Sequence, residues 1–189
     1  MSGKRGFTLI ELMVAIAITA ILLTVALPSF EVTLNSNRLT SSANEFVTAL
    51  QTARMEAIRR NQHTAVCFSA SAESAAPTCG AAGADGWITF VDADSDGSFD
   101  AGDSLLMSST LPPNVQLAGS PLLDAKVVFH TDGRARDADG ALLKGVARLC
   151  MPTRRPADNM HDVEIGAGSR VSTSRQDGGG SCSAPADPA

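Results

Sequence analysis

The chain has 189 residues and a formal net charge of −5, with 44 % hydrophobic residues and only 4 % aromatic ones. This length suits one globular domain besides a membrane segment. The small net charge gives no global preference for acidic or basic partners, and the lack of tyrosine leaves a base-stacking surface for nucleic acids poorly supplied.

The N-terminal region contains an apolar stretch, residues 7–27, in which Glu11 is the only charged residue. About 20 apolar residues cross a bilayer as a helix, and Lys4 and Arg5 ahead of them favour a cytoplasmic N-terminus. A secretory signal peptide is disfavoured because the basic leader is short, the apolar run is long and no A-x-A site follows. A carboxylate within a membrane span is costly and usually has a partner or a task.

The sequence GFTLIEL at residues 6–12 resembles the N-terminal motif of type IV pilins and pseudopilins. The resemblance implies cleavage of the leader, residues 1–6, after Gly6 by a prepilin peptidase, and methylation of the new N-terminus, Phe7. It also implies that Glu11 pairs with the N-terminal amine of a neighbouring pilin or pseudopilin during filament assembly. A buried carboxylate is tolerable when a buried cation offsets it, which agrees with this role.

The same resemblance implies a location. The chain is expected to cross the inner membrane once, with its globular domain in the periplasm, and then to join a pilus or pseudopilus. The transmembrane and assembly helix is predicted at residues 7–29.

Residues 30–62 are predicted to continue the helix as an amphipathic segment that ends near Asn61. Pro28 is expected to kink or loosen the helix between its two halves. Apolar residues recur in steps of three and four at Leu39, Ala43, Phe46, Leu50, Ala53 and Ala57. This stripe is the face that we expect to pack on a sheet.

Residues 63–175 show shorter segments with an apolar period of two, typical of a β-rich body. Strands are predicted at residues 64–69, 86–91, 104–109, 115–117, 126–131, 145–151, 162–165 and 170–174. Residues 176–189 are expected to form a flexible tail tethered by Cys182. The predicted fold class is α+β, a long N-terminal helix packed on an antiparallel β-rich domain. This layout resembles the GspH/FimT branch of the pilin superfamily, as does the sequence GWITFVD at residues 86–92.

Four cysteines lie outside the membrane segment, and an exported body favours two disulfides. Proximity in the sequence favours Cys67–Cys79 with Cys150–Cys182, and the two other connectivities remain open. No C-x-x-C sequence occurs, which disfavours a zinc or thioredoxin-like site.

Residues 92–103 are rich in Asp and Gly. Asp92, Asp94, Asp96, Asp100 and Asp103 fall at positions 1, 3, 5, 9 and 12 of a calcium-binding loop. An acidic hairpin turn is favoured over calcium, because the last position lacks the longer Glu and the flanks are predicted as strands. Asp and Gly are also the residues that tight turns select. Calcium remains the alternative, and no other cofactor is expected.

A second motif lies at residues 132–136. Asp132 and Gly133 predict a turn, and Arg134 and Arg136 would share one side of an extended segment. Two such guanidinium groups can bind successive phosphates. The sequence Gly-Arg-Ala-Arg resembles the Gly-Arg-x-Arg motif of FimT-like minor pilins that bind DNA in natural transformation. The resemblance implies that Arg134 and Arg136 contact DNA phosphates.

The alternative is that these two arginines pair with neighbouring aspartates in a solvated turn. A wider basic stripe is expected if further arginines fold onto the same face, namely Arg154, Arg155, Arg170 and Arg175. Residues 69–124 contain eight Asp or Glu and no Lys or Arg, which leans slightly against DNA binding. Binding should be led by the DNA backbone, sensitive to salt and tolerant of sequence.

These observations favour a minor type IV pilin of the FimT-like kind that binds DNA for uptake and contributes to pilus assembly. One alternative is a GspH-like minor pseudopilin of type II secretion, and another is a minor pilin that only primes pilus assembly. An enzyme is disfavoured, because none of the histidines lies in a zinc pattern or beside a nucleophile motif. The three histidines are His63, His130 and His161.

Overall fold

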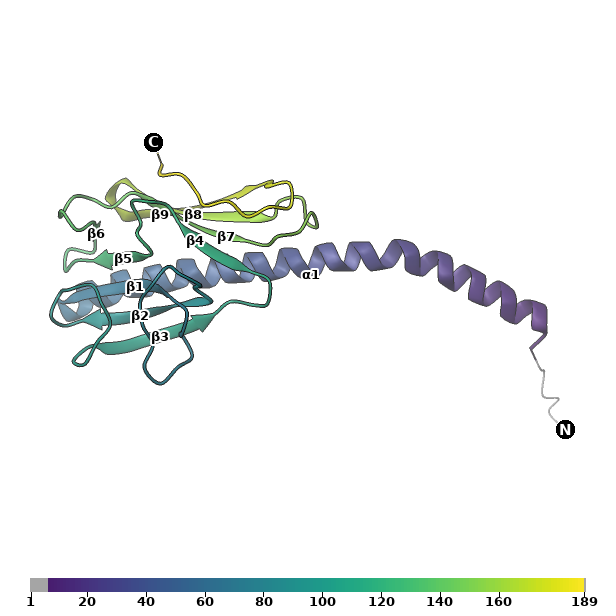
Figure 1. The fold of residues 1–189 in the computed structure, drawn as a ribbon, viewed down its shortest axis with the longest axis horizontal. Helices are drawn as coiled ribbons and strands as arrows, with labels where there is room; N and C mark the ends of the chain where they lie inside the picture. Colours follow the sequence, from purple (N-terminus) through teal and green to yellow (C-terminus); the bar gives the residue numbers. More distant parts are fainter. Residues whose placement is uncertain (1–6, 189) are drawn as a thin grey trace.

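The computed structural model describes residues 7–188, apart from the side chains of residues 25–28, and its longest element is a single helix. Helix α1 (Leu9–Arg60) is helical throughout its backbone, including the expected junction at position 28, and it bends over its N-terminal half (Figure 1). At 1.5 Å per residue it is about 78 Å long. The Thr8 hydroxyl caps its first turn, and Asn61 ends it in the left-handed conformation, with a φ of 53°.

Two antiparallel sheets follow α1 in the chain. Their strand orders are β3-β2-β1-β5-β6 and β4-β7-β8-β9. The strands are β1 (His63–Ser69), β2 (Gly86–Asp92), β3 (Ser104–Thr110), β4 (Gln116–Gly119), β5 (Lys126–Phe129), β6 (Ala135–Arg136), β7 (Gly145–Cys150), β8 (Met160–Gly166) and β9 (Arg170–Gln176). Each predicted strand corresponds to one of these within about two residues at either end, and β6 is the strand that the sequence pattern did not predict.

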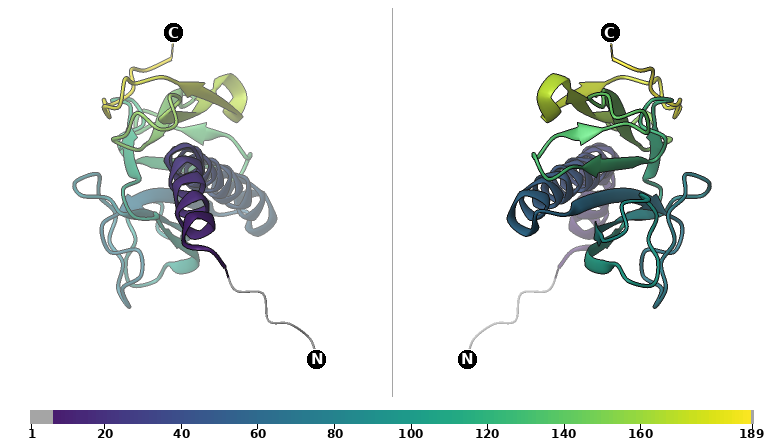
Figure 2. Two further views of the ribbon diagram at one scale, coloured as in Figure 1. Left: turned by 90° about the vertical axis from the view of Figure 1, so that its right-hand side faces the viewer. Right: turned by 90° about the vertical axis from the view of Figure 1, so that its left-hand side faces the viewer.

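The C-terminal half of α1 lies between the two sheets (Figure 2). It contacts β1, β2 and β5 on one side and β7 and β8 on the other. Its predicted apolar stripe is buried, with Phe46 fully enclosed. The Phe46 ring packs edge-on against Phe68 and Trp87, at centroid distances of 6.0 and 5.2 Å. Burying one such ring stabilises the fold by about 1.5–3 kcal/mol, so this stripe fixes the helix between the sheets.

Both favoured disulfides are present, with Cα–Cα distances of 5.5 Å for Cys67–Cys79 and 5.7 Å for Cys150–Cys182. The second bond attaches the C-terminal tail to β7. The tail has further contacts beyond Cys182. Leu122 donates its backbone N–H to Asp187 Oδ1 at 2.9 Å, so contacts reach almost to the end of the described chain.

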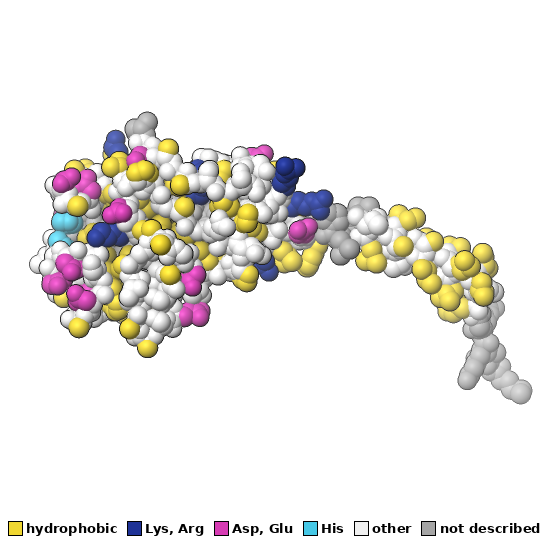
Figure 3. Space-filling view, viewed as in Figure 1, with side chains coloured by type: hydrophobic (Ala, Val, Ile, Leu, Met, Phe, Trp, Pro, Cys, Tyr) yellow, Lys and Arg dark blue, Asp and Glu magenta, His cyan; other side chains and the backbone are white. Residues whose placement is uncertain are grey.

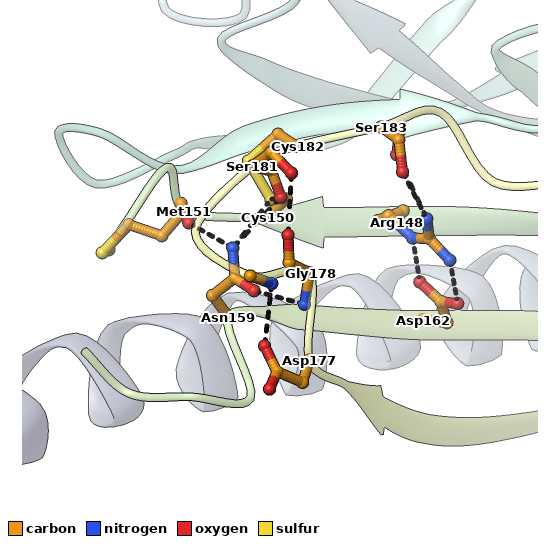
Figure 4. Close-up of a disulfide and its surroundings, with 11 residues drawn as sticks. Arg148, Cys150, Met151, Asn159, Asp162, Asp177, Gly178, Ser181, Cys182 and Ser183 are labelled. Carbon is orange, nitrogen blue, oxygen red and sulfur yellow. Dashed lines mark hydrogen bonds and ion pairs between the residues drawn. A yellow bond between two sulfur atoms is a disulfide. The ribbon is translucent and has the colours of Figure 1, made fainter. Parts of the chain in front are cut away.

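A buried ion pair lies beside this tail (Figure 4). Arg148 on β7 donates Nε and Nη2 to the two carboxylate oxygens of Asp162 on β8, at 2.6 and 2.7 Å. Its third nitrogen donates to the Ser183 carbonyl at 3.1 Å. The hydrogen bonds that Arg148 donates to Asp162 raise the pKa of the Arg148 guanidinium. Because all three of its nitrogens are occupied, Arg148 is a structural residue that joins the sheet to the tail.

Candidate nucleic-acid interface

The turn between β5 and β6 carries the Gly-Arg-Ala-Arg motif. His130 N–H donates to the Arg134 carbonyl at 3.0 Å, and Gly133 N–H donates to the His130 carbonyl at 2.8 Å. Gly133 has a φ of 72°, and a Cβ placed on it would lie 2.6 Å from Ile58 Cδ1. The turn therefore needs glycine both for its backbone conformation and for its close approach to the end of α1.

The two arginines of the motif have different surroundings. Arg136 Nη2 forms an ion pair with Asp132 Oδ2 at 3.0 Å, and Arg136 Nη1 donates to the Gly140 carbonyl at 2.8 Å. The Arg134 side chain is exposed, and its guanidinium makes no hydrogen bond or ion pair with any residue that the structure describes. Arg134 is thus available to a ligand, whereas Arg136 is engaged within its own turn.

Asp132 causes this difference between the two arginines. Its Oδ1 accepts the backbone N–H of Arg134 at 3.0 Å, and its Oδ2 accepts from Arg136. The backbone hydrogen bond from Arg134, together with the hydrogen bond from Arg136, lowers the pKa of the Asp132 carboxyl. The carboxylate is therefore ionised at neutral pH, where it holds Arg136 and shapes the turn below Arg134.

Two further arginines lie beside the turn that carries Arg134, next to Ser169. Ala135, the residue after Arg134, donates its backbone N–H to Ser169 Oγ at 2.6 Å. Arg54 on α1 donates Nη1 to the Ser169 carbonyl at 3.3 Å. Arg170 follows Ser169 directly, and it lines a pocket of about 270 Å³ together with Arg54. We call Arg54, Arg134 and Arg170 the arginine cluster.

Sequence reasoning did not single out Arg54. It lies four residues before Ile58, the side chain on which Gly133 packs, so it belongs to the face of α1 that meets the motif. The stripe of buried apolar residues identifies the inner face of α1. It does not indicate which residues on the outer face have a neighbour in space.

The other arginines of the expected basic stripe lie elsewhere. Arg155 Nη1 is 3.5 Å from Glu31 Oε2, roughly 35 Å from Arg54 along the helix. Arg154 donates Nε to the Gly179 carbonyl at 3.4 Å. Arg175 lines a separate pocket with Asn44 on α1, about 15 Å from Arg54 along the helix. Of the four additional candidates, the structure brings Arg170 alone to the arginine cluster.

The acidic loop after β2 is closed by its own carboxylates. Asp92 is buried and accepts the backbone N–H of Gly97 at 2.9 Å, and Asp103 accepts those of Ala93 and Asp100 at 2.9 and 3.1 Å. Burial raises the pKa of the Asp92 carboxyl.

Three carboxylates of this loop could hold a cation. Oxygens of Asp92, Asp94 and Asp96 lie within 4.8 Å of one another. Among the described residues, this is the one group in which three or more potential metal ligands come so close together. Asp100 and Asp103 are not part of it. Ca²⁺ takes six to eight oxygens, and the hydrogen bonds of Asp92 and Asp103 already hold the turn in shape without an ion.

The assembly motif lies at the opposite end of the molecule. Gly6 falls outside the described residues, and Phe7 is exposed. Glu11 and Thr8 form a capping box, in which Glu11 N–H donates to Thr8 Oγ1 at 3.3 Å and Thr8 N–H donates to Glu11 Oε2 at 3.5 Å. The following helix is long and apolar enough to cross a membrane, with a mean hydropathy of 2.5 over its most apolar 18 residues.

Comparison with known proteins gives matches at the level of family and fold. The minor type IV pilin FimU of Pseudomonas aeruginosa has a similar structure, with a TM-score of 0.53 and 18 % identity over 74 % of this chain and 90 % of the FimU chain. The minor pseudopilin EpsH from the type 2 secretion system of Vibrio cholerae has a TM-score of 0.50 and 13 % identity, over 73 % of this chain and 97 % of the EpsH chain. These likenesses confirm the predicted pilin-like α+β fold. No curated protein sequence matches the chain.

Two family models match the sequence. The prokaryotic N-terminal methylation motif matches residues 1–27, which identifies the apolar helix as the membrane anchor of a pilin. The model described as type II transport protein GspH matches residues 42–175, most of the chain. The chain therefore belongs to the GspH family of minor pilins and pseudopilins.

Proposed function

We propose that this chain is a minor type IV pilin that binds the DNA backbone through its arginine cluster and serves DNA uptake. The observation that carries the proposal is the exposed guanidinium of Arg134, which makes no hydrogen bond or ion pair with any described residue. Its turn contacts Ser169, the residue that accepts from Arg54 and precedes Arg170. Guanidinium groups bind phosphate oxygens in bidentate fashion. Arg136 acts indirectly in this proposal, because it neutralises Asp132 next to Arg134.

The proposed life cycle begins in the inner membrane, with the globular domain in the periplasm. A prepilin peptidase cleaves after Gly6 and the amine of Phe7 is methylated. Glu11 of one subunit then pairs with this amine of a neighbouring pilin as the chain enters the filament. The cluster lies near the end of α1 that is far from the membrane, which suits contact with extracellular DNA (Figure 1).

The proposal is tested by titrating fluorescent random-sequence duplex DNA with the oxidised body, residues 31–189, over a salt series. This body retains the whole buried core, since the core begins at Leu39. We expect Arg134→Ala to weaken binding about tenfold, the loss of about 1.5 kcal/mol for one charge-assisted contact. With three phosphate contacts, the logarithm of the binding constant should fall with the logarithm of the salt concentration with a slope of about −2.7. Each lost contact should make this slope shallower by about 0.9.

Arg154→Ala is the matched control, because it removes the same charge near the opposite end of the body. It should leave both the affinity and the salt slope close to those of the parent. Equal weakening by Arg154→Ala and Arg134→Ala would mean that net charge alone drives binding. Equal affinity of the parent and Arg134→Ala would rule out the arginine cluster as the site.

A second candidate function is that of a minor pseudopilin in type II secretion. The match to the GspH model and the likeness to EpsH favour it, as does the acidic segment at residues 69–124. Deleting the gene in the source organism separates the two. Loss of transformation with normal protein secretion supports the DNA-uptake role, and the reverse supports the pseudopilin role.

A further inference from the structure

The fold brings His63 and His130 together from distant parts of the sequence. His63 begins β1, and His130 follows the last residue of β5. In the antiparallel pairing of these strands Thr64 faces Phe129, so the next pair outward is His63 and His130. Their ring centroids are 4.1 Å apart, with an angle of 41° between the ring planes. Figure 3 shows the histidine side chains side by side at the end of the body far from the apolar helix.

Neither imidazole forms a hydrogen bond within the part of the chain that the structure describes. Both rings are only half-buried. Buried or half-buried histidines ordinarily use a ring nitrogen in a hydrogen bond that fixes their orientation. The paired rings of His63 and His130 therefore present unused donor atoms at one place on the surface.

The pair lines a pocket of about 500 Å³. Asp96 and Asp137 line the same pocket, and so do the cationic residues Lys126 and Arg136. Arg136 forms an ion pair with Asp132. Imidazole nitrogens combined with carboxylate oxygens are the ligand set of borderline divalent ions such as Zn²⁺ and Cu²⁺.

The spacing of the rings suits one shared ion. Zinc–nitrogen bonds are about 2.0–2.1 Å long, so two donors on a tetrahedral ion lie about 3.4 Å apart. The ring centroids lie 4.1 Å apart, so both side chains must turn and separate slightly to aim one nitrogen each at a common ion, and half-exposed side chains can change rotamer in this way. The neutral imidazole is the form that binds metal, so the site is tested at pH 7.5.

We propose that His63 and His130 form a two-imidazole site for a divalent transition-metal ion, with the remaining positions open to water. The site is distinct from the acidic loop, whose oxygen-only ligands suit hard ions such as Ca²⁺. It also does not depend on DNA binding, since it uses no residue of the arginine cluster.

The first test is calorimetric titration of the full-length chain in detergent, free of any polyhistidine tag, with Zn²⁺ at pH 7.5. We expect one saturable site per chain, lost in both His63→Asn and His130→Asn. Asp94→Asn, a carboxylate of the acidic loop, should bind Zn²⁺ as the parent does. Ca²⁺ should not compete. Absence of a saturable site in the parent, or unchanged binding in both histidine variants, overturns the proposal.

A second measurement needs no substitution and so decides the matter if a variant fails to fold. The chain has three histidines, and the third, His161, is 5 % exposed. Proton NMR of the imidazole C–H resonances should show two of the three signals changing on Zn²⁺ addition and returning with chelator. A response confined to the His161 signal, or no response, contradicts the proposed site.

Discussion

At the scale of single residues, Asp132 determines how the Gly-Arg-Ala-Arg turn presents its charge. The sequence places Arg134 and Arg136 two positions apart, which predicts equivalent side chains. The structure makes them unequal, because Asp132 accepts a hydrogen bond from the side chain of Arg136 but only from the backbone N–H of Arg134. The competing interpretation, an arginine locked to a neighbouring aspartate, thus describes Arg136 but not the guanidinium of Arg134.

Asp132→Asn should strengthen DNA binding severalfold. The substitution removes a negative charge beside Arg134 and releases Arg136 to make a further phosphate contact, so the salt slope should steepen by about 0.9. The measurement is the same salt-dependent titration of labelled duplex. Glu31→Gln is the control, since it changes the net charge equally but lies about 35 Å from Arg54 along α1. Weaker binding of Asp132→Asn would show that the carboxylate acts mainly by ordering the turn.

Gly133→Ala should destabilise the body by more than Gly140→Ala does. Both glycines have positive φ, 72° and 79°. An alanine in this conformation lowers the free energy of unfolding by about 1–2 kcal/mol. A Cβ at Gly140 meets no atom within 4 Å, whereas one at Gly133 meets Ile58 at 2.6 Å. Urea unfolding of both variants isolates the steric part as their difference, which we expect to be about 1 kcal/mol or more. Equal losses would mean that Ile58 moves aside freely.

At the scale of elements, the spacing of apolar residues predicts the helices and strands that are long and have a buried face. The step pattern from Leu39 to Ala57 predicts α1 because a buried helical face must repeat every three to four residues. The two-residue strand β6 is too short to show any period. The pairing of His63 with His130 and the placement of Arg54 beside Ser169 depend on strand order and helix docking, which no local pattern encodes.

The acidic loop should keep its shape without calcium. Its turn is closed by backbone N–H groups donating to Asp92 and Asp103, so no ion is needed to order it. We expect the melting temperature of the oxidised body to be the same, within about 1 °C, in calcium, magnesium or chelator. A rise with calcium alone, abolished in Asp94→Asn, would instead establish the loop as a calcium site.

At the scale of the whole molecule, the body depends on α1 being enclosed by two sheets, whose buried residues form one core with it. One titrating group within this assembly is His161 on β8, which is buried opposite Arg175. Burial, and secondarily the charge of Arg175, lower its pKa, while Asp158 and Asp162 act in the opposite direction.

This lowered pKa gives a pH dependence with a definite sign. The unfolded chain takes up a proton at His161 near pH 6.5 and the folded chain only at lower pH, so the free energy of unfolding falls as the pH drops below about 6.5. Urea unfolding of the oxidised body between pH 7.5 and 5.5 should show this loss. His161→Gln should reduce the slope, and an unchanged slope would assign the loss to other groups.

The unbroken course of α1 also sets the direction in which the body faces. A helix advances about 100° per residue, so one residue inserted near position 33 would rotate the arginine cluster by about that angle relative to the membrane half. Seven inserted residues would restore the original facing within about 20° and move the body roughly 10 Å outward. The direction in which the arginine cluster faces around the helix axis is therefore set by the number of residues between the membrane and the body, and not by any single contact.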